Sequence, residues 1–318
     1  MEIKSRKGLT VTLLTVLFIN FGQSALADGH QIIKVALLPI IDTLPFYVAQ
    51  ERGFFKEQGV KAEAIPVASG LERDQLMQAG VIDGMLNEMM TTANFNRNKS
   101  TVKVVMISRA ARNKHPMFRL LAGKNSNINA VKDLAGKSIG ISKNTIIEYV
   151  TDRLLEANGL NPNQVVKVSI PAIPERFQLL MQNQVPAVVL PDPLAKAAIA
   201  AGAKLVIDDS DNPKFSVSVL SFSVQSMNTS PQKIRGFLKA WDRAAAEINR
   251  APESFRNIML KRIRVPGNVK NTYAIPYFPR REVPDEKQWQ DVMSWMTNKG
   301  LLKSPLPYTG SITKEFLP

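Results

Sequence analysis

The sequence has no cysteine among its 318 residues. This absence excludes a thiol nucleophile, a cysteine metal site and any disulfide, so the fold must rely on packing alone. It also removes the cysteine that could carry a lipid anchor. Only two histidines are present, His30 and His115, and they lie far apart in the sequence. A histidine metal site or catalytic triad is therefore not expected, and we predict no enzymatic activity, no metal and no cofactor.

The sequence also lacks an apolar run long enough to span a bilayer comfortably. Its most apolar stretch, residues 9–21, follows a basic start over residues 4–7 and precedes a small-x-small site at residues 25–27. This order is typical of an export signal. We predict a signal peptide over residues 1–27, cleaved after Ala27, that leaves a soluble protein without a lipid anchor. An uncleaved membrane anchor is the alternative.

Lysine and arginine outnumber the acidic residues, and the formal net charge is +14. A basic balance can indicate nucleic acid, an anionic membrane or simple solubility. The basic residues are scattered, and the densest run, residues 261–264, is short and has no aromatic residues within it. We therefore interpret the basic residues as a solvated surface and expect no nucleic-acid partner. The length left after the signal suggests two domains of ordinary size.

The stretch from Thr43 to Val60 organises the rest of the chain. It lies between two apolar runs, residues 32–38 and 60–67, which predict strands. Asp42 or Thr43 can cap a helix that Pro45 opens, and a glycine at position 59 can end it. Asp42 and Thr43 thus lie at the carboxyl end of a strand, where open α/β sheets bind ligands.

A second helix start follows the strand at residues 60–67. Ser69 and Glu72 have the spacing of a capping box, which predicts a helix to about Ala79. Free amides at such a start can bind an anion, and Gly70 would let a ligand approach the backbone closely. Ser69 can equally serve only as the helix cap.

The same layout recurs later in the chain. Residues 138–141 predict a strand, residues 142–145 a polar loop, and residues 146–158 a helix. Ser142, Asn144 and Thr145 therefore lie at a helix start with unpaired amides. Ordinary capping is again the alternative. If both loops contribute, the site has two facing halves.

Two charged residues also follow predicted strands. Arg109 comes after the strand at residues 102–108, where a guanidinium could clamp an anion. Asp192 follows the strand at residues 187–190 and lies between two prolines that stiffen its backbone. Its carboxylate could accept hydrogen bonds from a ligand or from an arginine across the cleft, or it could cap the next helix.

Three motifs resemble a known family. A proline-aromatic pair precedes A-x-E-x-G-F-F and G-V in the stretch from Thr43 to Val60, V-K-D-L-A-G-K-S-I-G-I-S covers residues 131–142, and K-G-L-L with P-L-P-Y lies at residues 299–308. Together they are similar to the periplasmic solute-binding proteins of ABC importers. The resemblance is to the aliphatic-sulfonate, taurine, nitrate and thiamine-pyrimidine-precursor group, and it covers nearly all of the chain after the signal.

The resemblance implies an α/β fold of two lobes, the type II periplasmic-binding-protein fold, in which a mixed sheet flanked by helices forms each lobe. It places residues 28–122 and 222–318 in one lobe and residues 123–221 in the other. Ligand would lie between the lobes and close them by hinge motion. The implied setting is a monomer in the periplasm that delivers a small polar solute to an ABC permease and ATPase in the inner membrane.

The resemblance also implies that the loop after residues 81–86 faces the cleft, which adds Asn87, Glu88 and Thr91 to the candidate ligand-binding residues. Helix-start amides and Arg109 favour an anionic ligand such as a sulfonate or nitrate, whereas Glu88 and Asp192 favour a cationic or hydrogen-donating one. A taurine-like zwitterion or an aminopyrimidine would satisfy both. Two other functions stay open: a sensory or partner-presenting protein, and an enzyme of the same fold. Such enzymes use a cysteine nucleophile or a segment rich in histidine and cysteine, and the sequence has neither.

Overall fold

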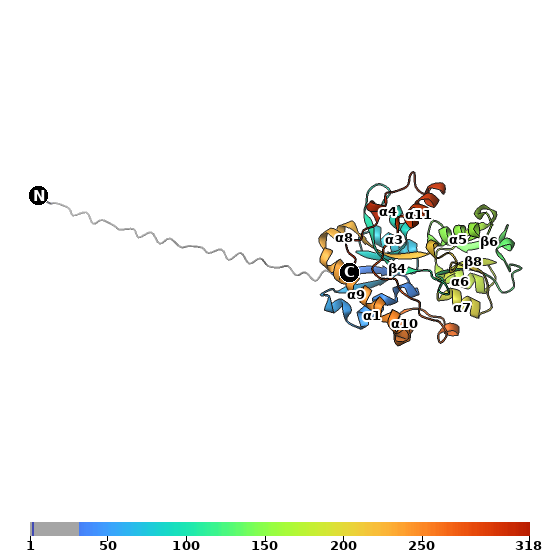
Figure 1. Cartoon of the computed structure of the whole chain (residues 1–318), viewed down its shortest axis with the longest axis horizontal. Coiled ribbons are helices and arrows are strands. Elements are labelled where there is room, and N and C mark those ends of the chain that lie inside the picture. Colours follow the sequence, from blue (N-terminus) through green and yellow to red (C-terminus); the bar gives the residue numbers. More distant parts are fainter. Residues whose placement is uncertain (1, 3–31) are drawn as a thin grey trace. The chain divides into compact units, whose positions relative to one another are not determined.

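The computed structural model describes residue 2 and residues 32–318 (Figure 1). Except for Glu2, the predicted signal peptide, residues 1–27, lies outside the described residues. Residues 32–318 form one compact unit. Within this part, no helix combines the length and the apolar character that a bilayer crossing requires.

Two five-stranded sheets with the same internal order form the framework. In the first sheet the strands lie in the order β2 (Ala62–Pro66), β1 (Ile33–Leu37), β3 (Gly84–Asn87), β10 (Val217–Ser223) and β4 (Val102–Ala110). In the second sheet the order is β7 (Val166–Ser169), β6 (Ser138–Ile141), β8 (Ala187–Pro191), β5 (Phe118–Ala122) and β9 (Lys204–Asp208). In each sheet four strands run in the same direction, and the fourth in this order runs antiparallel to both of its neighbours. Both sheets are therefore mixed, as the resemblance implied.

Each sheet is flanked by its own helices, and we call the two assemblies lobe one and lobe two. Figure 1 shows α5, α6 and α7 grouped around β6 and β8, and α11 beside α4 in the other lobe. Lobe one has α1 (Leu44–Glu51), α2 (Phe54–Glu57), α3 (Gly70–Gln78), α4 (Met89–Phe95), α8 (Val224–Thr229), α9 (Pro231–Arg250), α10 (Arg256–Arg262), α11 (Glu286–Asn298) and α12 (Tyr308–Ser311). Lobe two has α5 (Ile146–Ala157), α6 (Ile173–Met181) and α7 (Leu194–Ala200).

The chain crosses between the sheets twice. It leaves the first sheet after β4 and joins the second at β5, and it returns between β9 and β10. Strand pairing therefore changes within residues 111–117 and 209–216. The sequence-based boundaries, after residues 122 and 221, lie a few residues later, because β5 and β10 each pair with the sheet that the chain is entering.

The first βαβ unit differs from its prediction in two details. Gly53 has a φ of 77° and separates α1 from α2, so the single expected helix is two. Thr43 precedes α1 without capping it through its side chain, and the Asp42 carboxylate pairs with Arg109 instead. Gly59 adopts the left-handed conformation expected of it, with a φ of 65°. Glycine suits both turns because it has no Cβ to clash at positive φ.

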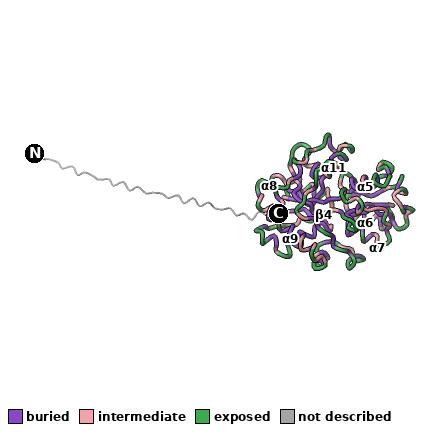
Figure 2. Tube along the Cα trace, in the orientation of Figure 1, coloured by how far each residue is buried: buried purple, intermediate pink, exposed green. Residues whose placement is uncertain are grey.

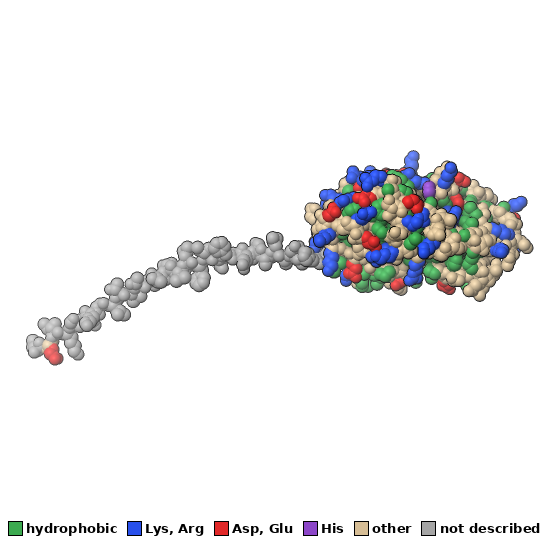
Figure 3. Space-filling model, turned by 90° about the horizontal axis from the view of Figure 1, so that it is seen from below, with side chains coloured by type: hydrophobic (Ala, Val, Ile, Leu, Met, Phe, Trp, Pro, Cys, Tyr) green, Lys and Arg blue, Asp and Glu red, His purple; other side chains and the backbone are tan. Residues whose placement is uncertain are grey.

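Buried segments lie in both lobes (Figure 2), and their apolar residues form several packed clusters. The α9 stripe of Phe237, Trp241 and Ala245 is fully buried, and Phe237 packs against Phe46 and Phe55 with ring centroids 6.1 and 5.1 Å away. A second apolar cluster includes residues of both lobes, from α4 and α11 on one side and from β6 and α5 on the other. Basic and acidic side chains are mixed over the face seen in Figure 3.

Candidate functional site

A cleft lies between the two lobes, at the carboxyl ends of their parallel strands. It holds about 550 Å³ of empty space, counting the solvent at its mouth. From lobe one it is lined by Leu38, Ile40, Asp42, Gly70, Arg73, Leu86, Asn87, Glu88 and Ser218. From lobe two it is lined by Phe118, Ser142, Thr145, Ile146, Ile147, Pro171, Ile173 and Pro191. This is the position at which open α/β sheets bind ligands, and its two walls differ in chemistry.

On the side of lobe one, a buried ion pair forms the floor of the cleft. Arg73 is 1% exposed, and its Nη1 lies 2.8 Å from Glu88 Oε2. Arg73 also donates through Nη1 to the Leu86 carbonyl, through Nη2 to Thr91 Oγ1 at 2.8 Å and through Nε to Asp74 Oδ1 at 2.8 Å. Burial opposes the charge on Arg73, but the carboxylates of Glu88 and Asp74 outweigh it and raise its pKa. The guanidinium is thus neutralised within lobe one.

Glu88 and Gly70 complete this floor. Burial raises the pKa of Glu88, and the nearby Arg73 guanidinium partly offsets the rise. Gly70 begins α3 directly against the guanidinium, where a Cβ would lie 3.3 Å from Arg73 Nη2. A side chain at this position would therefore press on the ion pair. Ser69 caps the helix by accepting the Glu72 amide at 3.2 Å, as expected.

A second ion pair lies behind the wall of lobe one. Arg109 is 2% exposed, and its Nη1 donates to Asp42 Oδ1 at 2.9 Å while Nη2 donates to the Pro116 carbonyl at 2.8 Å. Ser218 Oγ donates to the other Asp42 oxygen at 2.7 Å. Burial opposes the charge on Arg109, but Asp42 holds its pKa above the usual value. Asp42 lines the cleft and Arg109 does not, so the carboxylate is the member of this buried pair that reaches the cleft.

Lobe two contributes a polar loop and an otherwise apolar wall. Thr145 Oγ1 donates to the Ser142 carbonyl at 2.8 Å and accepts the Ile147 amide at 3.2 Å, which caps α5. Asn144 has a φ of 60°, and its backbone N–H donates to Glu148 Oε2 at 2.7 Å. Asparagine is among the residues that tolerate this left-handed conformation. Ser142 and Thr145 therefore reach the cleft as parts of a tightly bonded loop.

Asp192 forms its ion pair within lobe two. It is 5% exposed and forms an ion pair with Arg119 of β5, the neighbouring strand, whose Nε also lies 4.0 Å from Asp208 Oδ2. Burial raises the pKa of Asp192, against the opposing effect of Arg119. The arginine that it meets therefore belongs to its own sheet, and Asp192 does not line the cleft.

The structure brings together half of the residues predicted from sequence. Six of the twelve line the cleft: Asp42, Gly70, Asn87, Glu88, Ser142 and Thr145. The other six have partners in the fold or form the ends of elements: Thr43, Ser69, Thr91, Arg109, Asn144 and Asp192. Contact with a solute remains a prediction for all of them.

Sequence reasoning missed Arg73, Ser218 and the apolar wall. Arg73 follows Gly70 by three positions on the predicted helix, so its one-turn spacing from a cleft glycine was the available signal. Ile146, Ile147, Pro171 and Ile173 lie at the starts of helices or just after strands. Their positions could have been read from the predicted elements, but apolar residues there gave no chemical signal. In the described part of the chain, no group of three or more possible ligand side chains could hold a metal ion.

Comparison with known proteins decides the family. Residues 40–254 match the family model described as NMT1/THI5 like. The chain belongs to this family. A relative from Brachyspira hyodysenteriae, with the provisional name ABC transporter periplasmic binding protein, is 24% identical over 272 residues, 78% of this chain and 76% of its own. The 4-amino-5-hydroxymethyl-2-methylpyrimidine phosphate synthase of Legionella pneumophila is 21% identical over 285 residues, 86% of this chain and 88% of its own.

A solved structure shows the same fold. The alkanesulfonate-binding protein SsuA from Xanthomonas axonopodis pv. citri, bound to MOPS, superposes with a TM-score of 0.73 at 14% identity. The match covers 88% of this chain and 97% of that one. The predicted type II periplasmic-binding-protein fold is thereby confirmed for this NMT1/THI5-like chain.

Proposed function

We propose that this protein is the solute-binding component of an ABC importer. The observation that carries the proposal is a cleft lined by both lobes at the carboxyl ends of their strands. The NMT1/THI5-like family and the name of the Brachyspira relative support it. The proposed partners are an ABC permease and ATPase, and the proposed location is the periplasm, reached through the signal over residues 1–27. Hinge closure of the two lobes over the solute is part of the proposal.

The charge of the cleft bears on the class of solute. Its charged lining residues are Asp42, Glu88 and Arg73, so carboxylates outnumber the guanidinium although the chain carries a formal charge of +14. Arg73 already meets two carboxylates, and Arg109 gives its terminal nitrogens to Asp42 and Pro116. An anion such as nitrate would therefore meet guanidinium charges that carboxylates already balance. A solute that donates hydrogen bonds would instead find acceptors ready.

The apolar wall bears on the body of the solute. Ile146, Ile147, Pro171, Ile173 and Pro191 present hydrocarbon to the cleft from lobe two. Such a wall suits a ring or a short chain, because burying apolar surface stabilises a complex by about 25 cal/mol per Å². We therefore propose a small solute with an apolar body and an amino or amidine end. Among the classes considered, an aminopyrimidine fits better than taurine, an alkanesulfonate or nitrate.

A binding screen tests the function and the solute class together. Residues 28–318 would be titrated with 4-amino-5-hydroxymethyl-2-methylpyrimidine, taurine, an alkanesulfonate and nitrate, and unfolding would be followed by thermal shift. A solute at about 100 times its dissociation constant adds about 2.7 kcal/mol of stability. We expect this shift with the pyrimidine. Stabilisation by the anions alone would overturn the proposed solute class while leaving a binding function intact.

Enzymatic turnover is the second candidate, because the Legionella relative is named as a synthase. Against it, the chain has no cysteine, and the residues that line the cleft include no histidine and no lysine. His115 lies in the crossing between β4 and β5, bonded to Arg112 through the backbone. We therefore expect NMR spectra of protein incubated with the pyrimidine to show a bound but chemically unchanged molecule. Appearance of a product would favour the enzyme.

A further inference from the structure

One carboxylate joins the cleft loop of lobe two to the end of helix α11 of lobe one. Glu148 Oε2 accepts the Asn144 amide at 2.7 Å, and Oε1 accepts from Lys299 Nζ at 2.7 Å. Asn144 belongs to the loop whose Ser142 and Thr145 line the cleft. Lys299 directly follows α11. Glu148 therefore bonds at once to the ligand side of one lobe and to an element of the other.

Helix α11 belongs to lobe one but also packs on lobe two. Its Trp289 and Met293 share an apolar cluster with Met89 and Met90 of α4. On the other side, Trp295 Nε1 donates to Asp152 Oδ2 at 3.0 Å. The Trp295 ring meets the Tyr149 ring edge to face, with centroids 5.6 Å apart. The contact between α5 and α11 is thus a packed interface between the lobes.

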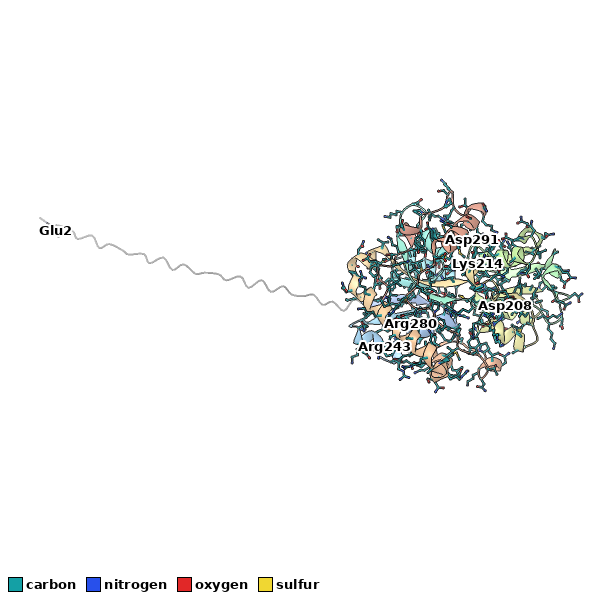
Figure 4. The ribbon with its side chains drawn as sticks, in the orientation of Figure 1. Glu2, Asp208, Lys214, Arg243, Arg280 and Asp291 are labelled. Atoms are coloured by element: carbon teal, nitrogen blue, oxygen red, sulfur yellow. The ribbon has the colours of Figure 1, made fainter. Side chains whose placement is uncertain are left out.

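A further polar contact lies along the same interface. Asp291 of α11, labelled in Figure 4, accepts from Tyr149 Oη at 2.5 Å and from Arg153 Nη2 at 2.9 Å, both on α5. These bonds continue the contact one turn along α5 from Glu148. Lys299 is therefore not an isolated surface cation but one end of an ordered row.

The charges at this interface balance across the lobes. Glu148 and Asp152 are each 3% exposed. Two lysines form ion pairs with them, Lys167 from lobe two and Lys299 from lobe one. Lys299 Nζ lies 2.7 Å from Glu148 Oε1 and 3.7 Å from Asp152 Oδ2. Removing Lys299 would leave two buried carboxylates with one ammonium group. Unbalanced buried charge is strongly unfavourable. The hydrogen bond between Glu148 and Asn144 therefore depends on Lys299 of lobe one.

The cleft loop needs the carboxylate that this interface holds. The backbone N–H of Asn144, at a positive φ within this loop, donates to Glu148 and so ties the loop to the carboxylate. Burial opposes the charge on Glu148, but the Asn144 amide and the Lys299 ammonium outweigh it and lower its pKa. The carboxylate is thereby kept ionised as an acceptor for the loop.

We propose that Lys299 and Glu148 are positioning residues that couple the order of the cleft loop to the contact between the lobes. Neither residue lines the cleft. When α11 lies against α5, Glu148 holds Asn144, and Ser142 and Thr145 are set for a solute. When the contact loosens, the loop loses its anchor. The proposal rests on the proposed function only in that the cleft takes a solute.

Hydrogen exchange without any solute tests the coupling directly. The Asn144 amide would be followed by NMR or mass spectrometry in the wild type, in Lys299→Met and in Lys303→Met, an exposed lysine four positions on. We expect exchange at Asn144 to quicken by about tenfold or more in Lys299→Met, since its bond depends on the balanced cluster. Lys303→Met should match the wild type, and Lys299→Arg should restore most of the protection.

Two further measurements keep the test decisive. Thermal unfolding and amides in β1 would show whether Lys299→Met acts locally, and Lys299→Gln is a milder replacement if methionine disturbs folding. Equal exchange rates at Asn144 in the Lys299→Met and Lys303→Met variants would overturn the coupling. Faster exchange spread evenly over both lobes in Lys299→Met would also overturn it. Because no solute is used, these results are independent of whether the proposed pyrimidine binds.

Discussion

Arg73 and Glu88 form a buried ion pair on the floor of the cleft, with Nη1 2.8 Å from Oε2. A free guanidinium here would attract anions, but this one is matched by two carboxylates. The cleft therefore offers acceptors to a solute rather than a cation. The pairing depends on long-range packing. It is the main reason to expect a solute that donates hydrogen bonds rather than an anion.

Replacing Glu88 by glutamine should weaken binding of 4-amino-5-hydroxymethyl-2-methylpyrimidine. The variant keeps the shape but loses the charged acceptor, and a hydrogen bond to a charged group contributes about 1.5–3 kcal/mol. The dissociation constant should therefore rise by about one to two powers of ten, as measured by calorimetric titration. Glu63→Gln, an exposed residue of β2, is the matched control. Equal constants for both variants would remove Glu88 from the solute's contacts.

Arg109→Met should act on stability. It leaves the buried Asp42 carboxylate with only the Ser218 hydroxyl among its former side-chain partners, and breaking a buried ion pair costs about 3–5 kcal/mol. Urea unfolding should show this loss, whereas Arg264→Met, at an exposed position, should change little. If Arg109→Met instead unfolds like the wild type and selectively loses taurine or nitrate binding, the arginine is an anion clamp after all.

Local sequence signals predicted much of the fold. The cap at Thr145, the left-handed turn at Gly59 and the strand Ser138–Ile141 all follow from residues nearby in the sequence. The pairing of charges could not be predicted in this way. Arg109 and Asp42 are 67 positions apart, and Arg119 and Asp192 are 73 apart. Which arginine meets which carboxylate depends on strand order and register, and these fix whether a charge faces the cleft or the interior.

Asp192→Asn separates two roles for this residue. Asp192 is buried, pairs with Arg119 and does not line the cleft, so we expect the variant to lose stability, by about 1–3 kcal/mol for a weakened charged hydrogen bond. Affinity for the pyrimidine should change less than twofold. Urea unfolding and calorimetric titration on the same samples give both quantities. A large rise in the dissociation constant at unchanged stability would place Asp192 in contact with the solute.

Asp209 should make stability depend on pH. It follows β9 in the crossing between the lobes, is fully buried, and accepts the amides of Met117 and Phe118 at 2.8 and 3.0 Å. Burial raises its pKa from 3.8 to about 6. Between these values the native state keeps a proton that the unfolded chain has lost. The unfolding free energy should therefore fall as pH rises through this window, by about 3 kcal/mol in all.

Asparagine at this position cannot titrate, so Asp209→Asn tests the prediction. The variant loses one of the two oxygens that accept backbone N–H groups, so it should be less stable than the wild type at about pH 4. Relative to the wild type it should then gain about 3 kcal/mol by about pH 7. Urea unfolding at several pH values measures this difference, with the exposed Asp211→Asn as a control that should follow the wild type. A difference between Asp209→Asn and the wild type that stays constant over this range would show that the pKa of Asp209 is not raised in the native state, with its two backbone amide bonds offsetting burial.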